Sequence, residues 1–106
     1  MKEVIITKYG PPDVLQIREK RSPYPGNGQV LIRNHFTGVN FSEIMARMRL
    51  YPGAPKPPAT LGSEACGVIE SVGKNVSRVK PGDRVMIFCQ YKSYATHIVT
   101  EESLVM

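Results

Sequence analysis

Asn40 and Tyr51 are the two side chains of this 106-residue chain whose types and settings best suit chemistry on a bound molecule. Asn40 precedes the pattern of a short helix, where its carboxamide offers two N–H donors and the helix dipole favours negative charge. Tyr51 carries a phenol that can stack on a flat molecule and donate a hydrogen bond or a proton. Each also has a structural alternative: Asn40 can simply cap the helix, and Tyr51 can pack beneath a proline-rich loop.

The other reactive residue types lack the partners that familiar catalytic groups need. His35 and His97 have no partner at metal-ligand spacing, and Ser42 has no nearby His or Asp of the kind that a hydrolase uses. Cys66 and Cys89 form no CxxC pair and lie in apolar, strand-like segments. We therefore expect both cysteines to be small buried hydrophobic residues without a disulfide.

Composition and charge limit the class of protein. Hydrophobic residues make up 42% and charged residues 22% of the chain, both ordinary for a single globular domain. No apolar run approaches the roughly 18 residues that span a membrane, and no signal-peptide pattern opens the chain, so we expect a cytoplasmic protein without an integral membrane segment. The net charge of +5 comes from scattered Lys and Arg, which favours solvated surface over a nucleic-acid partner. An anion-binding role around Arg47, Arg49 and Lys56 is the alternative.

Short strands separated by turns dominate the pattern along the chain. The segments with strand composition are Glu3–Lys8, Val14–Glu19, Gln29–Thr37, Ala65–Val72, Arg84–Cys89 and Tyr94–Val99, and Leu104–Met106 begins a further element. Gly10-Pro11-Pro12, Ser22–Gly28 and Lys80–Asp83 have the composition of turns and loops. A run of short strands with a single helix predicts a small β-barrel or sandwich.

The one helix is predicted directly after Asn40. Phe41, Ile44, Met45 and Met48 recur at the spacing of one helical face, so we expect that face to be buried. Asn40 at the N-cap and Glu43 three residues later match a capping box. The helix must end before Tyr51–Thr60, a constrained loop with four prolines.

Five short segments, in this order and spacing, resemble the N-terminal catalytic domain of medium-chain dehydrogenase/reductases. They are Tyr9-Gly10-Pro11-Pro12-Asp13-Val14-Leu15, Gly38-Val39-Asn40-Phe41, Leu50-Tyr51-Pro52-Gly53, Gly62-Ser63-Glu64-Ala65-Cys66-Gly67-Val68-Ile69 and Gly82-Asp83-Arg84-Val85. The resemblance implies a GroES-like, partly open β-barrel over residues 1–106, mainly β with one short helix. No G-x-G-x-x-G follows a strand, so the family's Rossmann domain is absent from this chain. We interpret the chain as an N-terminal fragment of a longer enzyme, inactive alone.

Two of these segments resemble the metal-ligand segments of zinc-containing members, with the ligands replaced. Zinc members carry His at the position of Ser63 and Cys at the position of Asn40. Hydroxyl and carboxamide groups are poor zinc ligands compared with imidazole and thiolate. The resemblance therefore implies the zinc-free, quinone oxidoreductase-like group, near its synaptic-vesicle membrane protein branch, with no bound metal.

The activity that this group implies is NADPH-dependent hydride transfer to a small-molecule quinone or activated alkene. The resemblance makes Asn40 and Tyr51 catalytic, places Asn40 and Phe41 at the cofactor, and places Ser63 and Glu64 in the substrate cleft. The structural alternatives are a core position for Phe41, small-residue packing for Ser63 and a backbone or Arg partner for Glu64. NADPH would be bound mainly by the missing domain, and the full-length protein could form a homodimer.

Two other functions fit the same pattern. A non-enzymatic module for nucleotide sensing or protein interaction would bind NADPH without turnover, and fold alone does not separate it from an enzyme. A polyketide-type enoyl reductase domain is disfavoured because the sequence begins at Met1 with no upstream module. A GroES-type co-chaperonin is disfavoured because the long loop is stiffened by prolines.

Overall fold

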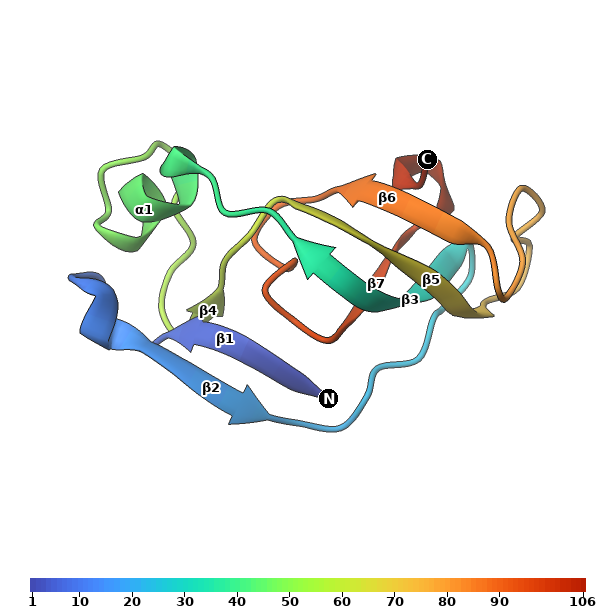
Figure 1. Cartoon of the computed structure of the whole chain (residues 1–106), viewed down its shortest axis with the longest axis horizontal. Coiled ribbons are helices and arrows are strands. Elements are labelled where there is room, and N and C mark those ends of the chain that lie inside the picture. Colours follow the sequence, from blue (N-terminus) through green and yellow to red (C-terminus); the bar gives the residue numbers. More distant parts are fainter.

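Two open antiparallel β-sheets and one short α-helix form the structure, a computed structural model that describes all 106 residues (Figure 1). The three-stranded sheet has the order β2-β1-β4, and the four-stranded sheet the order β6-β5-β3-β7. The elements are β1 (Lys2–Ile6), β2 (Leu15–Glu19), β3 (Gln29–Thr37), α1 (Phe41–Arg47), β4 (Ala59–Thr60), β5 (Glu64–Val72), β6 (Arg84–Phe88) and β7 (His97–Glu101), with 3₁₀ turns at Pro12–Val14 and Glu102–Leu104. The predicted mainly β, GroES-like fold with one helix is confirmed, and the sheets do not close into a barrel.

The central strand β3 accounts for most of the four-stranded sheet. Its residues Val30, Leu31 and Ile32 are 0%, 4% and 1% exposed, because β5 and β7 pair on its two edges and side chains cover both of its faces. Such a continuous apolar run is typical of a strand buried on both faces. The sequence prediction of this strand, Gln29–Thr37, matches the observed bounds.

Two clusters of buried side chains form the core. The larger cluster lies on the four-stranded sheet and contains Val30, Ile32, Ala65, Ile69, Val85, Ile87, Ile98 and Val105. The smaller cluster contains Ile6, Val14, Ala46 and Leu61. Ala46 is the only member from α1, and its complete burial against this cluster fixes the helix to the three-stranded sheet. The helix stands at one end of the molecule (left in Figure 1).

The prediction that the apolar face of the helix is buried is wrong. Phe41 is 72%, Ile44 38% and Met48 46% exposed, whereas the buried residues of α1 are Glu43, Ala46 and Arg47. Charged side chains can be buried here because they are hydrogen-bonded. Glu43 receives several donors that are described below, and the Arg47 guanidinium donates to the Gly10 carbonyl at 2.6 Å.

The last strand begins later than predicted. Strand β7 starts at His97, not at Tyr94, because the intervening segment pairs with the other sheet. The Val4 N–H donates to the Tyr94 carbonyl, and the Thr96 N–H to the Lys2 carbonyl, each at 2.8 Å. This segment therefore connects the two sheets before the chain enters β7.

The prediction of two buried cysteines also needs correction, and the structure adds detail on two other segments. Cys66 is exposed, because its inward-facing neighbours on β5 leave it on the outer face, while Cys89 is half-buried against the larger cluster. Strand β2 is an edge strand whose residues are all exposed, Ile17 to 74%. The C-terminal residues form a 3₁₀ turn followed by a bridge from Val105 to Ile87.

Candidate functional site

Asn40 and Ser63, the two residues that the family resemblance places at metal-ligand positions, meet at the side chain of Glu43. Asn40 is the N-cap of α1, and Ser63 directly precedes β5. The packing of Ala46 beside Leu61 brings the helix against the segment that leads into β5. These two segments are far apart in sequence, so their meeting is a product of the tertiary fold.

The Glu43 carboxylate accepts hydrogen bonds from both segments. Its Oε1 accepts from the Ser63 backbone N–H at 3.2 Å and from the Ser63 hydroxyl at 2.9 Å. Its Oε2 accepts from the Asn40 backbone N–H at 3.0 Å and from the Ser42 hydroxyl at 3.3 Å. Glu43 is 3% exposed, so a single buried carboxylate joins the start of the helix to the start of β5.

The Asn40 carboxamide is the most available donor of this group. Asn40 is exposed, and its side chain makes no hydrogen bond of standard geometry to the helix N–H groups. Its only hydrogen bond is a long one, 3.5 Å from Nδ2 to Glu43 Oε1. A carboxamide nitrogen carries two hydrogens, so one N–H remains free for a bound molecule. The Ser63 hydroxyl differs, because its proton is directed at Glu43 and only its lone pairs are free.

Tyrosines lie around the same carboxylate. Tyr51 follows the helix in the proline-rich loop and is 45% exposed. Tyr91 and Tyr94 pack against the smaller core cluster, which contains Ala46 of the helix. Burial raises the pKa of the Tyr91 phenol, and Tyr51 and Glu43 add to that shift. Burial also raises the pKa of Tyr94 to about 12, and the Glu43 charge adds to that shift. Both Tyr91 and Tyr94 therefore stay protonated through the neutral pH range.

Phe41 and Glu64 are placed near this group without joining its hydrogen bonds. The Phe41 ring is 72% exposed and directly follows Asn40, so it is an accessible aromatic surface and not a core residue. Glu64 is half-buried on β5, and its side chain lies over Gly38: a Cβ added there would fall 2.0 Å from Glu64 Oε1. The proximity of Glu64 to Ser63 is thus sequential, and its side chain turns toward the end of β3.

The donor set does not fit a zinc ion. No group of three or more His, Cys, Asp or Glu side chains lies together in a way that could hold a metal. At the two replaced positions, the Ser63 hydroxyl is bonded to Glu43 and the Asn40 carboxamide is a weak ligand. The Glu43 carboxylate is the one strong oxygen ligand there, and it is already occupied by donors.

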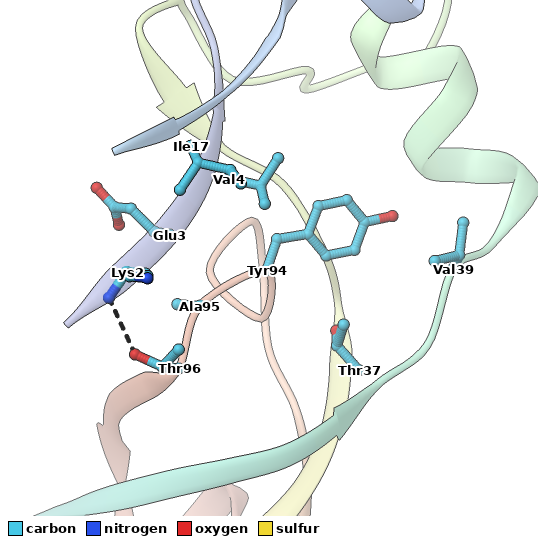
Figure 2. Close-up of a pocket in the computed structure, with 9 residues that line it drawn as sticks. All are labelled: Lys2, Glu3, Val4, Ile17, Thr37, Val39, Tyr94, Ala95 and Thr96. Atoms are coloured by element: carbon cyan, nitrogen blue, oxygen red, sulfur yellow. Dashed lines mark hydrogen bonds between the residues drawn. The ribbon is translucent and has the colours of Figure 1, made fainter. Parts of the chain in front are cut away.

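An apolar groove of about 430 Å³ runs between the two sheets beside this group (Figure 2). Figure 2 shows the Tyr94 ring extending across it toward Val39, with Val4 and Ile17 on the other side. Val39 and Ile17 are 72% and 74% exposed at its rims. Tyr94 thus lines both this groove and a smaller hollow that is also lined by Glu43.

None of the chain's helices has the length and apolar composition needed to cross a membrane.

Sequence reasoning missed the residue at the centre of the site. The capping-box pattern identified Glu43 as a partner of Asn40, and the structure contains the half of that box in which Glu43 accepts from the Asn40 N–H. The bonds from Glu43 to Ser63 had no local signal, because the two residues are 20 positions apart. Tyr91 and Tyr94 were likewise not predicted, and only their proximity in space places them here.

Comparison with known protein families agrees with this fold. The sequence profile of the alcohol dehydrogenase GroES-like domain matches residues 26–104. The chain therefore belongs to the alcohol dehydrogenase GroES-like domain family.

Within that family, the similar proteins include quinone oxidoreductases and VAT-1 homologues. The chain is 40% identical to the quinone oxidoreductase of Pseudomonas aeruginosa, over 98% of this chain and 32% of that protein. It is 43% identical to the human synaptic vesicle membrane protein VAT-1 homolog, over 79% of this chain and 22% of that protein.

Solved structures give the same grouping. The structure of the Escherichia coli quinone oxidoreductase complexed with NADPH matches all of this chain and 32% of its own, with a TM-score of 0.93 and 30% identity. The human VAT-1 homolog-like protein matches all of this chain and 35% of its own, with a TM-score of 0.94 and 31% identity. The chain thus spans about a third of the length of these structures.

Proposed function

We propose that this domain forms the substrate side of a zinc-independent, NADPH-dependent oxidoreductase that reduces quinones or activated alkenes. The observation that carries the proposal is the pairing of Asn40 and Ser63 through Glu43 at the two replaced metal-ligand positions. Membership of the family and similarity to quinone oxidoreductases support the reaction class. The activity belongs to the complete gene product, since this chain covers about a third of such relatives.

The chemistry requires a donor for a developing negative charge. A quinone or enone that accepts hydride gains charge on its carbonyl oxygen, and a fixed hydrogen-bond donor at that oxygen lowers the barrier. The free N–H of the Asn40 carboxamide fits this role, because Asn40 is exposed and its other N–H faces Glu43. Ser63 is less suited, because its hydroxyl proton is already donated to Glu43.

A proton must also reach the reduced product. Tyr51 is the candidate donor, because its phenol is accessible in the loop that follows the helix. Tyr91 and Tyr94 carry raised pKa values, which burial causes and Glu43 increases, so they are poor acids and better suited to shape the apolar wall. Glu64 would contribute polarity at the edge of the cleft beside Gly38.

NADPH, when bound, supplies the hydride. The residues of this chain that fit a nicotinamide are the exposed Phe41 ring and the neighbouring Asn40 carboxamide. A flat heterocycle can lie against an aromatic ring, and a carboxamide can bond to the polar substituent of that heterocycle. The rest of the cofactor would be held by the remainder of the complete protein.

The test is NADPH oxidation by the complete gene product against a panel of quinones and enones, with a metal chelator present. We expect turnover that survives chelation. We expect Asn40→Ala to reduce kcat by about 10²-fold, the order seen for loss of one oxyanion donor. Tyr51→Phe should reduce kcat and alter its pH dependence, because it removes the phenolic proton and keeps the ring.

The controls separate this proposal from a binding module. NADPH binding without turnover on any quinone or enone would overturn the enzyme and favour a nucleotide-sensing role. Turnover that is abolished by chelation and restored by zinc would overturn the zinc-free assignment. An unchanged kcat in Asn40→Ala would remove that residue from the site.

A further inference from the structure

We infer that Glu43 is the positioning residue of this site: its buried carboxylate holds Asn40 and Ser63 in the relative placement that the cleft requires. The inference rests on the proposed function, since positioning matters only if Asn40 and Ser63 meet a substrate. It assigns to this carboxylate the task of joining two segments that are far apart in sequence. Glu43 itself touches no reacting atom and acts through its two partners.

The bonds to Glu43 come from two distant segments and all point the same way. Asn40 and Ser42 donate from the start of the helix, and Ser63 donates from the chain entering β5. Every neighbouring group is a donor, and an ionised carboxylate is an acceptor with room for about four hydrogen bonds. The carboxylate is therefore matched to this environment.

The two backbone donors have no other partner in the chain. The Asn40 N–H and the Ser63 N–H each donate to Glu43 alone, at 3.0 Å and 3.2 Å. An unpaired N–H away from water is costly, so Glu43 contributes to holding both segments in place. An ordinary helix cap would join only the residues at the helix start, whereas here two of the five hydrogen bonds to Glu43 come from a residue 20 positions away.

A carboxamide cannot replace this carboxylate. In Glu43→Gln, the new NH₂ group faces either the Ser63 side or the Asn40 side of the old carboxylate. A serine hydroxyl can turn to accept from it, but a backbone N–H cannot. Whichever way the amide lies, one of the two backbone donors loses its acceptor, and the segment that carries this donor is held less firmly.

The decisive experiment compares Glu43→Gln with a matched variant in the complete gene product. The control is Glu102→Gln, the same substitution at a carboxylate of the C-terminal 3₁₀ turn that accepts from the Ser77 and Arg78 backbone N–H groups at 2.9 Å and 2.6 Å. We expect kcat for the quinone to fall between about 10-fold and 10²-fold in Glu43→Gln, because small misplacements of positioned groups cost that much. The KM for NADPH should change much less than kcat, because most of the cofactor would be held by the remainder of the complete protein. Glu102→Gln should lower stability and leave kcat intact.

A double variant distinguishes positioning from general damage. If Glu43 acts through its partners, Glu43→Gln should cause little further loss of kcat when it is added to a protein that already carries both Asn40→Ala and Ser63→Ala. A full additional loss in that background would overturn the inference, as would an unchanged kcat in a folded Glu43→Gln protein. If Glu43→Gln does not fold, the pair Asn40→Ala and Ser63→Ala still tests the link. Losses that multiply independently would contradict it, and losses smaller than their product would support it.

Hydrogen exchange gives a readout that does not depend on turnover. The Ser63 amide should exchange faster in Glu43→Gln than in the unsubstituted protein, while amides in the centre of β3 keep their protection. If the complete protein reduces no quinone, the proposed function fails, and this exchange result alone decides whether Glu43 holds the segments. Turnover with unaltered Ser63 exchange and unaltered kcat in Glu43→Gln would instead sink the inference and leave the function standing.

Discussion

Replacing Gly62 by alanine tests how tightly the segment before Ser63 is held. Gly62 has a φ of +100°, and a Cβ there would fall 2.1 Å from Ser93 Oγ, 2.6 Å from Tyr94 Cδ1 and 2.9 Å from the Tyr94 nitrogen. The hydroxyl of Ser93 could turn aside. The backbone nitrogen cannot, because the Tyr94 N–H bonds to the Leu61 carbonyl at 3.0 Å.

The expected cost has two parts. A non-glycine residue in this backbone region costs about 1–3 kcal/mol. Forcing the backbone and ring of Tyr94 apart adds about 1–3 kcal/mol of overpacking. Gly82→Ala isolates the first part, since Gly82 has a φ of +95° and nothing lies within 4 Å of its added Cβ. We therefore expect Gly62→Ala to be less stable than Gly82→Ala by about 2 kcal/mol.

Urea unfolding of the chain, followed by circular dichroism, measures this difference. With a slope of about 1–3 kcal/mol per molar urea, the midpoint of Gly62→Ala should lie about 1–2 M below that of Gly82→Ala. Equal midpoints for the two variants would refute the reasoning, because they would mean that the Tyr94 backbone yields without cost. A Gly82→Ala protein as stable as the unsubstituted chain would refute the strain component.

Three further outcomes follow from the structure. Burial opposes ionisation of Glu3, but hydrogen bonds from Arg18 and Thr60 and the charge of Lys20 outweigh it and lower the pKa of Glu3. The stability that Glu3 gives at neutral pH should therefore be lost as the pH falls below about 4. Glu3→Gln should make the urea midpoint depend less on pH in this acid range. Cys66 is exposed, whereas burial raises the pKa of the half-buried Cys89. At mildly alkaline pH, a thiol-specific reagent that contains a disulfide should therefore react first with Cys66. A fast reaction phase that persists in Cys66→Ser would contradict this expectation. Phe41→Ser should change the unfolding free energy by less than about 0.5 kcal/mol, because Phe41 is exposed, and it should raise the KM for NADPH in the complete protein. A loss of several kcal/mol would instead show that Phe41 is buried, as the helical periodicity predicted.

Local pattern predicted the elements that depend on local information. Gln29–Thr37 was located to the residue because an apolar run lies between a Gly-Asn-Gly turn and Gly38. The start of the helix was located because Asn40 and Glu43 have the spacing of a capping box. These signals need no knowledge of the remainder of the fold.

The failures share a cause, which is dependence on distant partners. Glu43 and Arg47 are buried only because Ser63 and the Gly10 carbonyl lie where their side chains end. Periodicity contains no information on these partners, and it predicted instead that the apolar residues of the helix are buried. Tyr94 has strand composition, but its backbone pairs with β1, so β7 begins at His97.

The site was predicted in part for the same reason. Asn40 and Ser63 were paired through the family resemblance, and the structure brings them to one carboxylate. The identity of that carboxylate was not predicted, because it required the tertiary contact between α1 and the chain entering β5. The side chain of Glu64, which follows Ser63 in the sequence, points away from this group toward Gly38.

The order of strands in the larger sheet has a consequence for how the protein is made. Strand β3 is synthesised early, yet its two partners are β5 and β7, and its contact from Gln29 to Glu101 spans 72 residues. While His97–Glu101 is still inside the ribosome, the edge of β3 that pairs with β7 has no partner, and this part of β3 contains the apolar residues Val30 and Ile32. Bare apolar edges pair readily with other chains. Late arrival of β7 therefore makes ribosome-bound intermediates of this domain the species most prone to aggregate, and folding should proceed over milliseconds to seconds, as in other sheets closed by distant strands.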